Sequence, residues 1–136
     1  MTRQKQISIV ATNFHRKEVE LMLAESRRVC EEKGLEVANA LWVPGALETP
    51  LALLRELSAA DIDGAIVLGI IERGETKHGL VMGMAVISAI VDIQLKLGKP
   101  IGVAILGPEV LPEQIPLRLH PYAKDAALAV WEMLNS

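Results

Sequence analysis

The chain has 136 residues, and its 14 Lys and Arg against 17 Asp and Glu give a formal net charge of -3. This length suits one domain with a sizeable core, so we expect residues 1–136 to form a single domain. The acidic balance excludes the basic surface that nucleic-acid binding requires, and we expect no such partner. Cys30 is the only cysteine, so no disulfide framework exists, which suits a reducing compartment.

The sequence predicts neither a targeting segment nor a membrane span. The N-terminus, Met1 to Gln6, lacks the apolar run of a signal peptide. The longest charge-free run, residues 79–91, is shorter than the ~20 residues that a spanning helix needs. We therefore expect a soluble, cytoplasmic protein with no membrane partner.

Apolar runs and helical periodicity predict strands and helices in alternation along the chain. The expected strands are 7–12, 35–43, 65–71 and 101–106, and the expected helices are 16–33, 48–59, 78–97 and 122–134. Prolines at 108, 112, 116 and 121 predict a loop before the last helix. This alternation indicates an α/β fold, a flavodoxin-like three-layer α/β/α sandwich with a four-stranded parallel sheet.

In such a fold, ligands bind beyond the carboxyl ends of the strands. The segment Gly69 to His78 follows an apolar run and leads into the third helix, and it is the most polar of these ends. A helix N-terminus offers unpaired N–H groups and a positive partial charge. The segment is therefore a candidate site for an anion such as phosphate.

The helix expected from Gly79 onward is apolar on nearly every side. After Lys77, its first charged residue is Asp92. A helix on the outside of a monomeric α/β domain should have a polar face. We therefore expect this helix to be buried against a neighbouring subunit, in an obligate homo-oligomer. Met82, Met84 and Met133 are interpreted as core filling.

Several segments together resemble one enzyme family. Residues 43–50, VPGALETP, are similar to V-P-G-A-x-E-x-P, and residues 73–78, RGETKH, to R-G-E-T-x-H. Residues 13–15, NFH, lie where the family has an aromatic residue. Residues 113–124 contain an E-Q-x-x-x-R pattern followed by a later Lys. The chain resembles, over almost its whole length, the 6,7-dimethyl-8-ribityllumazine synthases of riboflavin biosynthesis. The Gly107-Pro108 loop resembles the corresponding loop of archaeal members of that family.

The resemblance implies a transferase that condenses 5-amino-6-(D-ribitylamino)uracil with 3,4-dihydroxy-2-butanone 4-phosphate. Phosphate and water leave, and neither a metal nor a redox cofactor takes part. The nucleophile is the amine of the substrate itself, so the protein must position two substrates and move protons. The family also forms homopentamers, which in some members stack into decamers or close into sixty-subunit shells, with sites between subunits.

For the phosphate half of the site, the resemblance implies a cradle of Gly74, Glu75 and Thr76. It assigns phosphate pairing to Arg118 of a neighbouring subunit, with Lys124 as an accessory cation. His78 becomes the general base or proton shuttle, because a helix N-terminus disfavours the protonated imidazole. Each assignment has a structural alternative, since Thr76 could be a helix cap and Arg118 a solvated surface residue.

For the ring half of the site, the resemblance implies stacking on Phe14 and binding of the ribityl hydroxyls by Glu48. Other expected lining residues are Ala46, Leu47, Ile70, Ile71 and Val103. The structural alternatives are a core role for Phe14 and a helix-dipole role for Glu48.

Three residues depart from the family pattern in or near the ring pocket. Glu72 stands where Ile is usual, His15 where Asn is usual, and Val103 where many members carry Phe. These changes leave open whether substrate or activity is altered. They motivate an alternative function, a non-catalytic relative that binds a flavin or lumazine, or one that only forms a shell.

Overall fold

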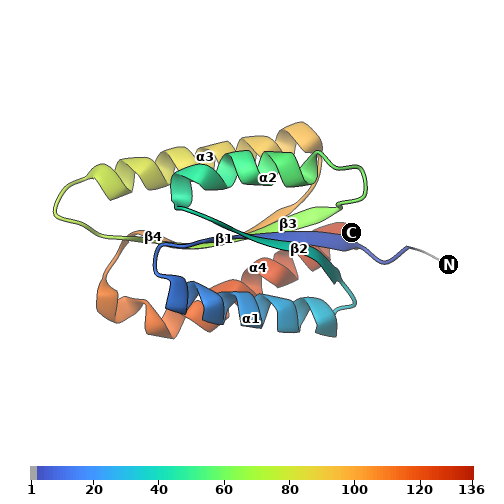
Figure 1. The fold of residues 1–136 in the computed structure, drawn as a ribbon, viewed down its shortest axis with the longest axis horizontal. Coiled ribbons are helices and arrows are strands. Elements are labelled where there is room, and N and C mark those ends of the chain that lie inside the picture. Colours follow the sequence, from blue (N-terminus) through green and yellow to red (C-terminus); the bar gives the residue numbers. More distant parts are fainter. Residues whose placement is uncertain (1–2) are drawn as a thin grey trace.

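The computed structural model describes residues 3–136. Its strands form one parallel sheet in the order β2-β1-β3-β4. Helices α2 and α3 cover one face and α1 and α4 the other (Figure 1), so the predicted three-layer α/β/α sandwich is confirmed. The elements are β1 Gln6–Thr12, α1 Arg16–Glu32, β2 Glu36–Val43, α2 Thr49–Leu57, β3 Gly64–Glu72, α3 His78–Leu97, β4 Ile101–Val110 and α4 Leu119–Leu134.

The two central strands are apolar on both sides because helices cover both faces of the sheet. Along β3, Ile66 and Leu68 pack into the core under α1 and α4. Ala65 and Val67 point the other way, into the core under α2 and α3. This alternation explains why β3 reads as a continuous apolar run. It also brings the end of the run, Ile70 and Ile71, to the carboxyl edge of the sheet.

The two largest differences in element boundaries from the sequence-based expectation both involve prolines. Strand β4 continues through Gly107-Pro108, which is a cis peptide, to Val110, where a loop was expected. Pro108 is tolerated there because β4 is an edge strand. Helix α4 begins at Leu119 rather than Tyr122, because Pro121 falls in its first turn, where a backbone N–H has no helical partner.

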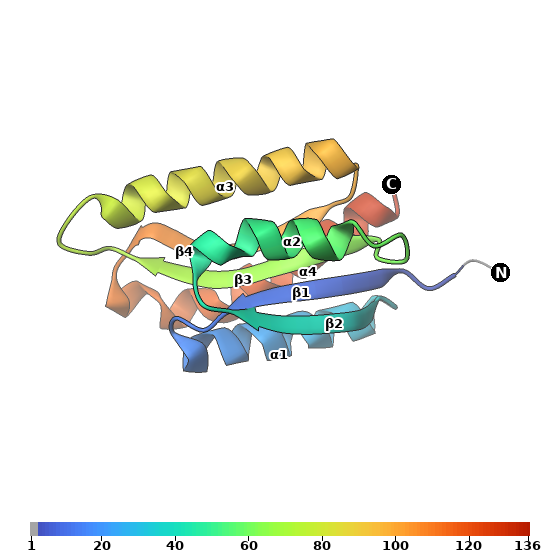
Figure 2. The same ribbon diagram turned by 45° about the horizontal axis from the view of Figure 1, so that its top comes forward.

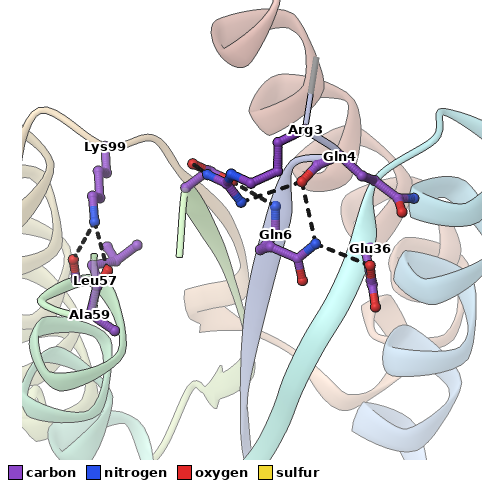
Figure 3. A network of polar contacts seen from close by, with 8 residues as sticks. Arg3, Gln4, Gln6, Glu36, Leu57, Ala59 and Lys99 are labelled. Carbon is purple, nitrogen blue, oxygen red and sulfur yellow. Dashed lines mark hydrogen bonds and ion pairs between the residues drawn. The ribbon is translucent and has the colours of Figure 1, made fainter. Parts of the chain in front are cut away.

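Polar contacts tie together the amino ends of the strands, opposite the expected site. Lys99 Nζ donates to the carbonyl oxygens of Leu57, at 2.8 Å, and Ala59, at 3.0 Å (Figure 3). Gln6 Nε2 donates to Glu36 Oε2 at 3.0 Å and joins β1 to β2. These contacts satisfy polar groups at the base of the sheet and leave the carboxyl edge to the loops.

Helix α3 has one buried face and one apolar face exposed to solvent. Gly83, Val86, Ile90 and Ile93 are buried against the sheet and α2. On the other side, the exposed large apolar residues are Val81, Met84, Val91 and Leu95. By length and composition α3 is able to cross a membrane, although the charge-free run alone was expected to be too short. Its buried face makes it a layer of the sandwich.

Candidate active site

The connections after β1, β2 and β3 meet at the carboxyl edge of the sheet. Figure 2 shows the β3–α3 connection extending past the ends of the other strands. Between these connections lies a pocket of about 370 Å³. Its lining residues are Phe14, Gly45, Ala46, Leu47, Glu48, Ile70, Ile71, Glu72, Gly74, Thr76, His78, Gly79 and Met82. This is the location expected for a ligand in a parallel α/β sheet.

Most of the predicted site residues line this pocket together, although they come from segments far apart in the sequence. Those brought together are Phe14, Ala46, Leu47, Glu48, Ile70, Ile71, Gly74, Thr76 and His78. Those that lie outside it in the single chain are Glu75, Val103, Arg118 and Lys124. In the second group, Glu75 lies in the β3–α3 loop, and the other three residues lie on β4, on the short turn Pro116–Arg118 and on α4.

The loop between β3 and α3 is open to solvent, and a hydroxyl contacts the first backbone N–H of the helix. Thr76 Oγ1 accepts a hydrogen bond from the backbone N–H of His78 at 3.3 Å, at the first residue of α3. The N-cap residue of α3 is Lys77, so the alternative of Thr76 as helix cap was wrong, and the proton of the Thr76 hydroxyl stays available for a further acceptor. His78 is exposed at the pocket wall. The loop can thus present a hydroxyl and helix N–H groups to one anion.

The opposite wall of the pocket is apolar and accessible. Phe14 is 56% exposed, which rules out the core role considered for it. Leu47 lies in the short turn Ala46–Glu48, and buried Thr49 closes that turn by donating from its hydroxyl to the Ala46 carbonyl oxygen at 2.7 Å. Ile70 and Ile71 are buried, so what they offer a ligand is mainly backbone. Such a wall suits a flat ring bearing polar edges.

Comparison with known proteins identifies the family. The family model of 6,7-dimethyl-8-ribityllumazine synthase matches residues 4–136. The chain belongs to the lumazine synthase family. A 6,7-dimethyl-8-ribityllumazine synthase of Staphylothermus marinus is 33% identical over 129 residues, covering 95% of this chain and 86% of the relative. One of Metallosphaera sedula is 33% identical, covering 93% and 84%. One of Pyrobaculum arsenaticum is 35% identical, covering 90% and 82%.

The two predicted cations of this lumazine synthase family member lie apart from the pocket of their own chain. Arg118 Nη1 donates to the Gln114 carbonyl oxygen at 2.8 Å, and Arg118 lines a separate hollow beside Pro108 and Tyr122. Lys124 lies on α4 beside a hollow shared with α1. A role for Arg118 in catalysis therefore requires the pocket of another subunit.

Glu75 and Val103 also lie outside the pocket. Glu75 is exposed and lines a shallow hollow with Thr76 and Glu109, next to the pocket. Val103 lies in the middle of β4, paired with Val67, and packs against the core under α2 and α3. Val103 therefore contacts no ligand in the pocket of its own chain.

Three lining residues, Gly45, Gly79 and Met82, were not expected from the sequence, and Glu72 was noted only as a departure. Met82, interpreted as core filling, lines the pocket one helical turn after His78. The i, i+4 spacing on α3 was the signal that could have identified it. Met84 and Met133 are exposed, so core filling was the wrong interpretation for both. Gly45 lines the pocket within the VPGALETP motif, and Glu72 lines it at the end of β3.

The acidic and sulfur side chains of the described chain do not form a metal site. Among residues 3–136, no cluster of three or more His, Cys, Asp or Glu could hold a metal ion. Cys30 is buried in α1, and burial raises the pKa of its thiol to about 11. A thiol with that pKa stays protonated near neutral pH and is a poor nucleophile.

Proposed function

We propose that this protein condenses 5-amino-6-(D-ribitylamino)uracil with 3,4-dihydroxy-2-butanone 4-phosphate to give 6,7-dimethyl-8-ribityllumazine and phosphate, in riboflavin biosynthesis. The observation that carries the proposal is the convergence of segments 13–15, 44–48 and 70–78 on one pocket. Each of these segments carries a motif of the family, and the relatives named above carry this enzyme's name. We propose that residues 1–136 act as one domain.

The phosphate group is bound at the start of α3. The Thr76 hydroxyl already accepts the His78 N–H, so it can donate its own proton to a phosphate oxygen. Gly74 and Glu75 offer backbone N–H groups beside it, and the helix N-terminus favours the negative charge. Phosphate is the leaving group, and the same contacts stabilise the charge that builds on it.

His78 moves protons next to this anion. The 5-amino group of the pyrimidine attacks the ketone carbon of the butanone, and loss of water gives an imine. Phosphate then leaves with the electron pair of its C–O bond, and the ribityl-bearing amine closes the second ring with loss of a second water. Each step transfers a proton at nitrogen, carbon or oxygen, and an imidazole at the pocket wall can accept or return it.

The pyrimidine is held by the apolar wall. Phe14 offers a ring face for stacking, because its side chain is largely exposed beside the pocket. Glu48 accepts hydrogen bonds from ribityl hydroxyls, and backbone groups of Ala46, Leu47, Ile70 and Ile71 contact the ring edge. This wall and the phosphate loop face one space, which brings the two substrates together.

We also propose that the protein works in the cytoplasm as a homo-oligomer built on pentamers, alone, stacked as decamers or closed as sixty-subunit shells. The exposed apolar residues of α3, with Leu47 and Leu51 nearby on the same layer, support burial against another copy. In this assembly, Arg118 of one subunit, with Lys124 as its accessory, completes the phosphate site of the next. A guanidinium can bind two phosphate oxygens at once.

Mixing the purified protein with both substrates tests the function directly. Lumazine fluorescence should grow well above the uncatalysed rate and stop when either substrate is omitted. A rate equal to the uncatalysed one would contradict the enzymatic function. It would favour the second candidate, a ligand-binding relative, which the carboxylate of Glu72 in the pocket motivates. That candidate predicts saturable quenching of riboflavin fluorescence without turnover.

A further inference from the structure

His15 has two features that the fold does not explain. Its backbone lies in the left-handed region, with φ 59° and ψ 45°, which is unfavourable for a residue with a side chain. It precedes α1 without capping it through its side chain. Its Nε2 atom is buried and makes no hydrogen bond to residues 3–136. An unsatisfied buried ring nitrogen is costly, so a partner is expected close by.

The acid that faces this nitrogen, without a formed hydrogen bond, is Glu72, the last residue of β3. Glu72 Oε1 lies 3.5 Å from His15 Nε2. The adjacent cation, Arg73, pairs with another acid, because its Nε lies 3.4 Å from Glu109 Oε2. Glu109 is the other non-glycine residue of the described chain with positive φ, at 73°. His15 and Glu109 thus contact two successive residues, Glu72 at the end of β3 and Arg73 just after it.

Glu72 also lines the pocket, together with Phe14. The Phe14 ring packs edge-on against the His15 imidazole, with centroids 4.5 Å apart and planes at 77°. His15 therefore contacts both the apolar ring and the acid that border the ring half of the pocket. A carboxylate accepts hydrogen bonds with two oxygens, and His15 faces one of them. The second oxygen has no hydrogen bond or ion pair with residues 3–136, so it retains the capacity to accept from a ligand.

We propose that Glu72 is a specificity-determining residue that accepts a hydrogen bond from an N–H of the bound pyrimidine, and that His15 is the positioning residue that holds its carboxylate. The ligand class is an amino-substituted pyrimidine with an N–H donor on its ring edge. This inference rests on the proposed function for the nature of the ligand. A ligand without that donor leaves the carboxylate unpaired in the pocket, which is how polar sites reject analogues.

The test compares Glu72→Gln, Glu72→Ile and His15→Asn in the full-length protein. Both Glu72 variants should raise the KM for the pyrimidine about ten- to a hundredfold, the range spanned by a hydrogen bond to a charged group. The KM for the butanone phosphate should stay within about twofold. His15→Asn should raise the pyrimidine KM less, since Asn tolerates the left-handed backbone but loses the imidazole.

The double variant His15→Asn/Glu72→Gln separates positioning from a merely structural role. If His15 acts only through Glu72, the double variant should match Glu72→Gln alone, because residues of one network are not additive. Additive losses would overturn the positioning role. Matched controls are Glu132→Gln and His120→Asn on α4, two exposed residues whose replacement should leave both KM values unchanged.

Calorimetric titration with 5-amino-6-(D-ribitylamino)uracil alone keeps this inference separate from the proposed function. Weaker binding by both Glu72 variants supports the inference even if the protein shows no turnover. Normal turnover and unchanged pyrimidine affinity in Glu72→Gln would overturn the inference while leaving the function intact. Equal increases in both KM values would also overturn it, because they indicate a general disturbance of the pocket.

Discussion

Gly102 on β4 lies against the backbone carbonyl of Ala126 on α4. A Cβ atom at position 102 would overlap that carbonyl and lie 2.9 Å from Val130 Cγ2. Since the obstacle is helix backbone, it cannot move aside without shifting α4. We expect Gly102→Ala to lower the free energy of unfolding by about 1–3 kcal/mol, as overpacking does. Urea denaturation measures this change.

Gly74→Ala is the matched control for that stability measurement. A Cβ at position 74 meets nothing within 4 Å. The same substitution there should alter the free energy of unfolding by less than about 1 kcal/mol. Equal effects at both positions would contradict the close contact between β4 and α4.

His78→Ala should slow the reaction without abolishing it. General acid–base catalysis typically contributes ~10²–10⁴-fold, and the nucleophilic amine belongs to the substrate. We expect kcat to fall by a factor in that range, with a smaller effect on either KM. Steady-state lumazine fluorescence provides the measurement. An unchanged kcat would remove His78 from the proton transfers.

Arg118→Ala should selectively weaken binding of the butanone phosphate. In its own chain Arg118 Nη1 contacts only the Gln114 carbonyl among the hydrogen bonds of the described residues, so the guanidinium retains donors for an anion. We expect the KM for the butanone phosphate to rise at least about tenfold and the KM for the pyrimidine to stay within about twofold. Arg118→Lys should recover part of the lost affinity for the butanone phosphate. Its positive charge remains, but the bidentate geometry of the guanidinium does not. Equal effects on both substrates would mean that Arg118 does not bind phosphate.

Asp63 should make stability depend on pH at the acidic end. Partial burial by itself raises the pKa of Asp63, but hydrogen bonds from the Gln6 backbone N–H at 2.7 Å and from Arg3 Nη2 at 2.7 Å outweigh it, so the pKa lies below its ordinary value. A carboxyl with a lowered native pKa stabilises the fold above the unfolded pKa, about 3.9, and the stabilisation is lost as pH falls through the native value.

We therefore expect Asp63→Asn to cost about 1–3 kcal/mol at pH 7, the range for hydrogen bonds to a charged group. The difference between variant and wild type should shrink steadily below about pH 4. Chemical denaturation at several pH values follows it. A difference that is constant from pH 7 to pH 2.5 would show that ionisation of Asp63 does not stabilise the fold.

Charges on the exposed face of α3 should prevent assembly. Leu95 is 78% exposed and Val91 is 43% exposed in the single chain, so Glu at both positions should not disturb the core. In an interface, the same charges would be desolvated without partners. We expect Val91→Glu/Leu95→Glu to be a monomer by native mass spectrometry at micromolar concentration. Met133→Glu, at a 64% exposed position on the opposite layer, is the control. A monomeric wild-type protein would contradict the proposed interface.

The layers of the fold follow from apolar runs and helical periodicity that are visible in the sequence. Two-sided burial makes β3 a continuous apolar run, and that run fixes the position of the β3–α3 loop with its Thr76 and His78. The extension of β4 beyond Gly107 was not predictable, because proline ends most strands and the edge position of β4 emerges only from the sheet order.

The site residues also divide into those that the sequence could predict and those that it could not. Residues that belong to local motifs were predicted, because each motif occupies one strand end. The contact between His15 and Glu72 was not predicted, since it joins residues 57 positions apart and depends on a left-handed backbone that is uncommon for non-glycine residues. The role of Arg118 was implied by the family resemblance alone, and in the single chain its side chain lines a hollow outside the pocket.

The exposed apolar face of α3 has a consequence for how this enzyme should be assayed. The same helix carries His78 and Met82 into the pocket and turns Val81 and Met84 outward. If copies associate through that face, the working site exists only in the associated form, and its population follows mass action. Activity per milligram should then fall on dilution and show a lag when a dilute sample is concentrated.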